Sequence, residues 1–165
     1  MAASLPIINS ARKSDLYAAI TYQVEKLLNF EADLLANLAN IVAVLHKAFD
    51  FYWTGFYLRR DTDLVLGPFQ GDVGASRVAV APSPKGISGA AALQCLTLIV
   101  PDVADFDGHL AHHPLSRSEI AVPLVTRGRA EMVLNINSMD LAGFDTFDQA
   151  GLENVIRLIE RRYFR

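Results

Sequence analysis

Cys95 is the only cysteine among the 165 residues of this chain. Chemistry that cycles between two thiols and a disulfide needs a second cysteine, so an intramolecular cysteine pair is excluded. The neighbours of Cys95 are apolar, which predicts a buried and unreactive thiol. Any catalysis by this chain is therefore expected to use other residue types.

Three of the four histidines, His109, His112 and His113, lie close together after Asp107. Imidazole and carboxylate groups can ligate zinc, so a metal-dependent activity of this loop is one interpretation. However, the spacing matches no standard zinc motif, and the sequence has no H-E-x-x-H helix. We expect solvated loop histidines, with no bound metal and no other cofactor.

A second group of candidates lies on predicted strands. In the strand 52–59, Trp53, Gly55 and Tyr57 share one face because side chains alternate along a strand. A glycine between two aromatics could let a ligand approach the backbone closely. On this pattern alone, ordinary packing of the aromatics in the core is the simpler interpretation.

The predicted strand 130–137 carries two amides, Asn135 and Asn137, on the face opposite its apolar side chains. Asparagine is a poor strand former, so these amides indicate either a solvated sheet face or the polar floor of a pocket. Glu119 opens the neighbouring strand. It could be a solvated charge paired with Arg117, or it could anchor a cationic group of a ligand.

Ser88 lies in the sequence Gly86-Ile-Ser-Gly-Ala90, which only loosely resembles the turn around a hydrolase nucleophile. That motif needs a glycine two residues after the serine, and position 90 is alanine. The simpler interpretation is that Ser88 caps or opens a helix, where backbone N–H groups favour anions.

Three long segments show helical periodicity. The first runs from Leu16 to Leu28 with Ser14 or Asp15 as its expected cap, and the second runs from Leu34 to Phe49. The last ends near Tyr163 and is expected to be capped by Asp145. A shorter helix is predicted over residues 87–94, and 101–117 is read as a long loop, a kind of segment that often carries function.

The remaining segments alternate with period two and predict strands at 52–59, 64–69, 77–81, 97–100, 119–125 and 130–137. Two pairs of these strands flank short turns, which indicates hairpins and a largely antiparallel central sheet. The expected fold class is α+β, with helices packed on one face of the sheet. We find no linker or repeat and predict one domain over 1–165, with a flexible start at 1–13.

Composition excludes several classes of partner. The net charge is −3 and no Lys/Arg run occurs, so no nucleic-acid partner is expected. No stretch of about 20 apolar residues is free of polar side chains, so no membrane span is expected. The start of the chain lacks a signal-peptide pattern, which together with the lone thiol predicts a cytoplasmic protein.

Several blocks of the sequence resemble the GAF-fold free methionine-(R)-sulfoxide reductases, in matching order from about Tyr17 to Arg162. The blocks are Trp53-Thr-Gly-Phe-Tyr-Leu, Leu64-Val-Leu-Gly-Pro-Phe-Gln-Gly71, Val100-Pro-Asp-Val, Asp107-Gly-His-Leu-Ala and Ser116-Arg-Ser-Glu-Ile. The resemblance implies a GAF-like α+β fold, a homodimer and a closed pocket for a small polar molecule. In that pocket Trp53 and Tyr57 would form aromatic walls and Glu119 would meet the ligand.

The resemblance also identifies changed positions. Asn135 and Asn137 stand where the family pattern has two aspartates, and Ser88 and His112 stand where it has cysteines. A further family cysteine falls loosely near Val78. Thiol chemistry needs an attacking thiolate and a resolving thiol, and neither serine nor histidine replaces them.

The sequence therefore predicts a small-polar-molecule-binding protein, whose ligands include amino-acid-like molecules, on the reductase frame with thiol catalysis lost. One alternative is a protein that still reduces free methionine-(R)-sulfoxide by an unrecognised route. Another alternative is a metal-dependent enzyme that uses His109, His112 and His113.

Overall fold

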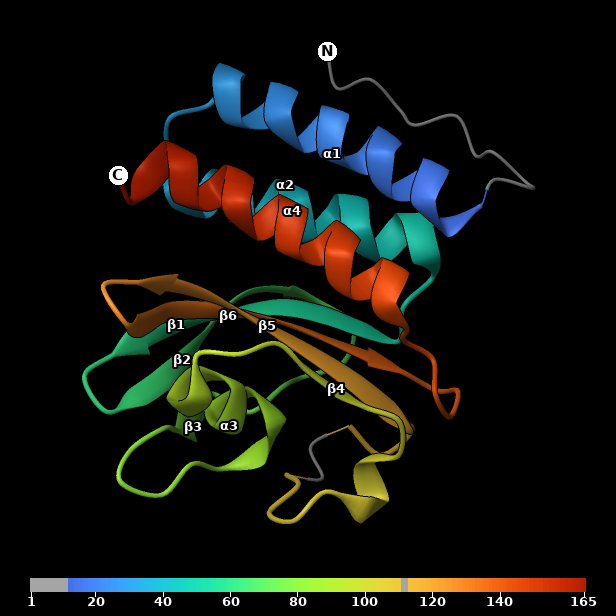
Figure 1. The fold of residues 1–165 in the computed structure, drawn as a ribbon, viewed down its shortest axis with the longest axis vertical. Helices are drawn as coiled ribbons and strands as arrows, with labels where there is room; N and C mark the ends of the chain where they lie inside the picture. The colour runs from blue at the N-terminus through green and yellow to red at the C-terminus, as the bar shows by residue number, and fades with distance from the viewer. Residues whose placement is uncertain (1–11, 111–112) are drawn as a thin grey trace.

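The computed structural model describes residues 12–110 and 113–165 and shows an antiparallel sheet between two layers (Figure 1). The elements in chain order are α1 (Lys13–Phe30), α2 (Leu34–Phe49), β1 (Trp53–Arg60), β2 (Asp63–Gln70), β3 (Arg77–Ala79), α3 (Gly86–Gln94), β4 (Leu98–Val100), a 3₁₀ turn (Val103–Asp105), β5 (Ser118–Thr126), β6 (Arg129–Ser138) and α4 (Thr146–Tyr163). Within the described residues, no helix is both long and apolar enough to cross a bilayer.

The sheet has six strands in the order β3-β2-β1-β6-β5-β4, and every neighbouring pair is antiparallel. Both predicted hairpins, β1–β2 and β5–β6, are present. The expected α+β class with a central antiparallel sheet is confirmed. The strands begin or end within two residues of the predicted limits, where a period-two pattern gives least information.

The three long helices cover one face of the sheet, as expected, and α1 forms the outermost layer (Figure 1). Their apolar stripes meet one face of β5 and β6 in a core that includes Ile20, Leu45, Ile120, Leu134 and Val155. The short helix α3 lies on the opposite face with the described parts of the loop, residues 101–110 and 113–117 (Figure 1). The prediction placed all helices on one face, but the apolar face of α3 packs in a second core with Trp53 and Val133.

Local sequence explains most helix ends. Asp33 accepts a hydrogen bond from the backbone N–H of Ala36 at the start of α2, and Asp145 caps α4 as predicted. At α4 the Asp145 and Asp148 side chains each accept from the other's backbone N–H, which is a capping box.

The start of α1 differs from the prediction. The helix begins at Lys13 with Arg12 in the cap position, and no side chain caps it. The predicted caps, Ser14 and Asp15, lie inside the helix. Residues 1–11 of the predicted flexible start lie outside the described residues, whereas Lys13 is helical because a tertiary contact holds it.

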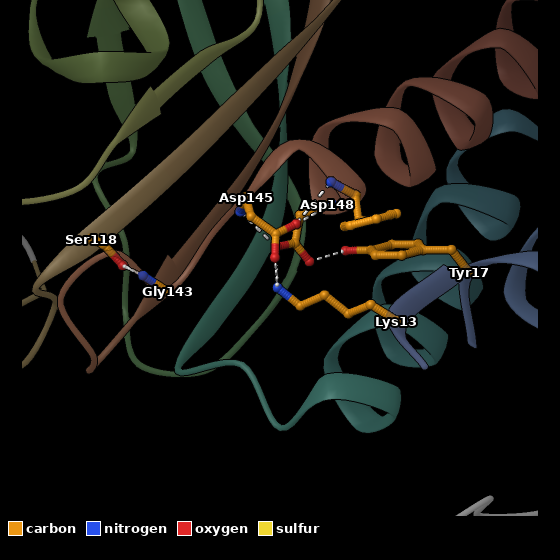
Figure 2. Close-up of polar contacts among 7 residues, drawn as sticks. Lys13, Tyr17, Ser118, Gly143, Asp145 and Asp148 are labelled. Carbon is orange, nitrogen blue, oxygen red and sulfur yellow. Dashed lines mark hydrogen bonds and ion pairs between the residues drawn. The ribbon is translucent and has the colours of Figure 1, made fainter. Parts of the chain in front are cut away.

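That contact joins α1 to the first turn of α4 (Figure 2). The Lys13 ammonium lies 2.9 Å from Asp145 Oδ2 and also contacts Asp148. The Tyr17 hydroxyl donates to Asp148 Oδ1 at 2.9 Å. Gly151 makes room for the ring, since a Cβ there would lie 2.2 Å from Tyr17 ring atoms. This group is called the α1–α4 latch below.

Candidate functional site

A small, partly open cavity lies on the α3 side of the sheet. Its volume is about 30 Å³, and β1, β5, β6, α3 and the 101–117 loop all contribute to its wall. The lining residues are Tyr57, Ala75, Val78, Gly86, Ile87, Ser88, His109, Leu110, His113, Glu119 and Asn135. At roughly 10–15 Å³ of such space per water molecule, the cavity holds about two. An amino-acid-sized ligand is larger than this volume.

Strand register brings the polar side chains together. Residue 119 of β5 lies opposite Asn137 of β6, and Asn135 lies two positions further along β6 on the same face. Met132, Leu134 and Ile136 point the other way into the helix-side core, as the alternation predicted. Asn135 and Asn137 are both buried, so the interpretation of a solvated sheet face is wrong.

A chain of hydrogen bonds ends on Glu119. Ser116 Oγ donates to Asn137 Oδ1 at 2.7 Å, and Asn137 Nδ2 donates to Asn135 Oδ1 at 2.8 Å. Asn135 Nδ2 in turn donates to Glu119 Oε1. All four residues are buried, so the chain forms a polar network inside an apolar layer.

Glu119 is 7% exposed and is not a solvated strand-end charge. Arg117 is exposed, and no ion pair joins it to Glu119 among the described residues. Burial penalises the carboxylate and raises the pKa of Glu119 to about 7, although the hydrogen bond from Asn135 opposes that shift. The carboxyl group therefore changes its protonation state near neutral pH.

The aromatic pair forms a stacked wall at one side of the cavity. Trp53 stacks on Tyr57 with ring centroids 6.0 Å apart and on Phe69 at 5.8 Å, and its Nε1–H donates to the backbone oxygen of Asp72. Tyr57 lines the cavity, while Trp53 lies behind it. Burial, and then the nearby Glu119 charge, raise the pKa of Tyr57, so this phenol stays protonated as a hydrogen-bond donor.

Gly55 has a different role from the expected one. A Cβ at this position would lie 2.4 Å from Trp53 Cη2 and 2.7 Å from the Phe69 Cβ. The glycine therefore leaves room for the stacked rings and does not give a ligand access to the backbone.

Helix α3 supplies the wall opposite the sheet. It begins at Gly86, which has φ +60, and its cap position is Lys85, so of the two expectations for Ser88 the helix cap is wrong and the helix opening is met. Ser88 instead lies buried in the first helical turn and lines the cavity, as does Val78 of β3. Ser88 stands where the resemblance places a family cysteine, and Val78 is the looser match to another. Both positions therefore line the same cavity as Glu119.

The histidine loop closes part of the cavity. His109 and His113 both line it, and the His113 ring lies 4.8 Å from the Trp53 ring, centroid to centroid. His112 lies outside the described residues. Within 12–110 and 113–165, no three His, Cys, Asp or Glu side chains are placed to hold a metal ion.

Cys95 lies away from the cavity. It follows the last residue of α3, is partly exposed, and has a left-handed backbone with φ 56. Its Sγ lies 3.6 Å from the backbone oxygen of Ala92 and 3.5 Å from that of Gly128. The prediction of a fully buried thiol is therefore wrong, because the helix end carries the residue to the surface.

Sequence reasoning missed Ser116 as part of the polar network. Ser116 precedes β5, so no strand periodicity connects it with Asn137. The only usable signal was its place in the Ser116-Arg-Ser-Glu-Ile block. Reasoning also missed that Trp53 and Asn137 support the cavity from behind, while Asn135 and Tyr57 face it.

The fold is that of a GAF domain. The chain is 40% identical to the GAF domain-containing protein A of Dictyostelium discoideum over 154 residues, which cover 93% of this chain and 96% of that protein. It is 37% identical to the free methionine-R-sulfoxide reductase of Escherichia coli (strain K12) over 150 residues, 90% of this chain and 89% of that protein.

A solved structure agrees. The free methionine-R-sulfoxide reductase from Neisseria meningitidis, in complex with its substrate, has a TM-score of 0.91 at 38% identity, covering 99% of this chain and 96% of that one. No family model matches the chain. The chain belongs to the family of GAF-domain proteins that includes the free methionine-R-sulfoxide reductases.

Proposed function

We propose that this protein binds a small polar molecule in the cavity beside Glu119 and does not reduce it with thiols. The ligand would meet Tyr57, Glu119 and Asn135 directly, with Trp53 and Asn137 holding them in place. The observation that supports this most is the identity of residue 88. A serine hydroxyl lines the cavity where the family resemblance calls for a cysteine thiol.

A serine at position 88 in place of a cysteine removes the thiol route, because that route takes its electrons from thiols. Reducing a sulfoxide to a thioether takes two electrons and two protons, releases water, and leaves a disulfide on the two thiols that supplied them. Ser88 cannot supply these electrons. Cys95 lies at the other end of α3, about 10 Å further along the helix axis, and does not line the cavity.

The catalytic half of the proposal is tested by turnover. We expect no NADPH consumption above background when purified protein is mixed with free methionine-(R)-sulfoxide, thioredoxin and thioredoxin reductase. The Escherichia coli relative serves as the positive control. Turnover that persists through purification and is lost in Tyr57→Leu would contradict the proposal and favour reduction by an unrecognised route.

The binding half is tested by titration. Trp53 is the only tryptophan of the chain, so its fluorescence reports on the cavity wall. We expect free methionine sulfoxide to bind weakly, with a Kd in the millimolar range, about −4 kcal/mol. Tyr57→Leu should abolish the response, whereas Tyr22→Leu, at an exposed position on α1, should not. No response in wild type, with no small molecule retained in native mass spectrometry, would contradict binding.

The proposal also covers assembly, compartment and metal. We expect a cytoplasmic homodimer, which sedimentation velocity and fractionation of cells would test. We expect no zinc after dialysis, by elemental analysis. Near-stoichiometric zinc that is lost in a His109→Ala, His113→Ala double variant would support the metal-dependent alternative.

A further inference from the structure

The direction of the hydrogen-bond chain fixes which atoms of Asn135 face which neighbours. Asn137 Nδ2 donates to Asn135 Oδ1, so Asn135 Nδ2 faces Glu119. Rotating the Asn135 amide by a half turn would set its oxygen against the Glu119 carboxylate and its NH₂ against that of Asn137. The direction is set at the Glu119 end, because an ionised carboxylate only accepts, whereas the Ser116 hydroxyl at the far end donates to Asn137 Oδ1 and could accept as well.

This arrangement leaves a donor and an acceptor beside each other at the cavity. An amide NH₂ has two N–H groups, and Asn135 uses one of them on Glu119. A carboxylate can accept about four hydrogen bonds, so Glu119 can accept from a ligand in addition to Asn135. Both residues line the cavity, and their direct contact places the two functions within one hydrogen-bond length.

The charges of the wall disfavour an ionic headgroup. Glu119 is the only acidic residue among the lining residues, and they include neither lysine nor arginine. A carboxylate headgroup would meet the like charge of Glu119. An ammonium headgroup could pair with Glu119, but it cannot accept from Asn135 and leaves that N–H without an acceptor. Removing both partners of an ion pair from water offsets much of its Coulombic gain, so pairing with Glu119 does not make the ammonium the better headgroup. A neutral carboxamide leaves neither Asn135 nor Glu119 without a partner.

We propose that the cavity selects a ligand with a neutral carboxamide-type group, in which a carbonyl oxygen accepts from Asn135 and an adjacent N–H donates to Glu119. This inference rests on the proposed binding function and names the ligand class for it. Asn137, which lies behind the cavity, acts as a positioning residue because its Nδ2 donates to Asn135 Oδ1 and so favours the orientation in which Asn135 Nδ2 faces Glu119.

The test compares three probes that share one tail and differ in the charge of the headgroup. They are 4-(methylsulfinyl)butanamide, 4-(methylsulfinyl)butanoate and 4-(methylsulfinyl)butan-1-amine, neutral, negative and positive respectively. Each is titrated at pH 8 and followed by Trp53 fluorescence. We expect the amide to bind at least tenfold more tightly than either charged probe.

Variants separate the positioning argument from general damage to the cavity. Asn135→Asp with Asn137→Asp should reverse the order, so that the amine binds at least tenfold more tightly than the amide. If that double variant does not fold by circular dichroism, Asn135→Asp alone is used. Asn154→Asp, at an exposed position on α4, adds a charge elsewhere and should leave the order unchanged.

Failure of this inference and failure of the proposed function give different results. If the amine or the butanoate binds wild type most tightly, the cavity binds small molecules but the carboxamide assignment is wrong. If none of the three binds, the binding function itself fails, and the assignment fails with it.

Discussion

Two buried carboxylates lie on opposite sides of the sheet and have different surroundings. Asp148, in the α1–α4 latch, is fully buried and is surrounded by the Lys13 ammonium, the Tyr17 hydroxyl and the backbone N–H of Asp145 (Figure 2). Glu119 has the neutral amide of Asn135 as its hydrogen-bond donor and lies at the wall of a cavity. A buried acid with a cation and donors on its oxygens holds elements together, whereas a buried acid beside a cavity can still accept a ligand.

The aromatic neighbours of the two acids follow a common pattern. Tyr17 lies against Gly151 and Trp53 lies against Gly55, and in each case a Cβ on the glycine would enter the ring. In the latch the ring ends in a hydroxyl that binds the acid directly. Beside the cavity, the ring of Trp53 instead supports Tyr57, which faces Glu119 across the open space.

The largest expected effect comes from removing the latch carboxylate. Asp148→Ala takes away the acceptor of Lys13 and Tyr17 and one half of the capping box, so it should lower the free energy of unfolding by about 3 to 4 kcal/mol. Denaturation in urea measures this loss. The matched control is Asp15→Ala, whose exposed ion pair with Arg12 at 3.4 Å should contribute less than about 1 kcal/mol. Equal losses in both variants would remove the distinction between the latch and a surface ion pair.

The contribution of Glu119 to folding stability should depend on pH in the opposite sense to that of an ion-paired carboxylate. The pKa of Glu119 rises from 4.5 to about 7 on folding, so the folded state binds this proton more tightly than the unfolded chain does. The resulting stabilisation is fully present below pH 4.5 and is lost as the pH rises through about 7. Glu119→Gln imitates the protonated form and should exceed wild type in stability by about 2 to 3 kcal/mol at pH 8.

The same two proteins should be nearly equal in stability below pH 4.5. Tyr57, His109 and His113 line the same cavity and are unchanged between the two proteins, so the difference between variant and wild type isolates the Glu119 contribution. Urea denaturation at several values of pH gives the curve. A variant that is less stable than wild type at pH 8 would show that Glu119 is held as an ion by partners, like Asp148.

Alanine at Gly55 or at Gly151 should lower the free energy of unfolding by an intermediate amount, but only the change at Gly55 should alter tryptophan emission. Gly55→Ala pushes against Trp53 and Phe69 and should cost about 2 kcal/mol, with a shift of tryptophan emission and weaker ligand binding. Gly151→Ala pushes against Tyr17 at a shorter distance and disturbs the latch, so even after alanine regains about 1 kcal/mol of helix propensity its net cost should be about 2 kcal/mol as well. Its tryptophan emission should match wild type, and a matching emission shift in both variants would contradict separate roles.

The sequence predicted the fold more completely than the site, for physical reasons. Periodicity located the three long helices and the strands, because each of them buries a regular apolar stripe, and α3 was recognised from its alanine-rich composition. Alternation in β6 also singled out Asn135 and Asn137. Periodicity could not show that α3 crosses to the opposite face, or that Ser116 reaches Asn137, because both depend on how connecting segments run in space. The burial of Glu119 likewise depends on β4, α3 and the loop closing over the end of β5.

The smallest effect is expected at Cys95, which is part of neither the α1–α4 latch around Asp148 nor the cavity beside Glu119. Its left-handed backbone, with φ 56, is strained for any residue that has a Cβ, and glycine is the usual residue after a helix end. Cys95→Gly should therefore raise the free energy of unfolding by about 0.5 to 1 kcal/mol, less a few tenths for the weak contacts of Sγ with Ala92 and Gly128. Cys95→Ala keeps the strain and loses those contacts, so it should be neutral or slightly destabilising, and both variants should bind the butanamide probe as wild type does. Loss of binding in the folded Cys95→Gly protein would place the thiol in the ligand site and would undo the argument that the cavity works without sulfur.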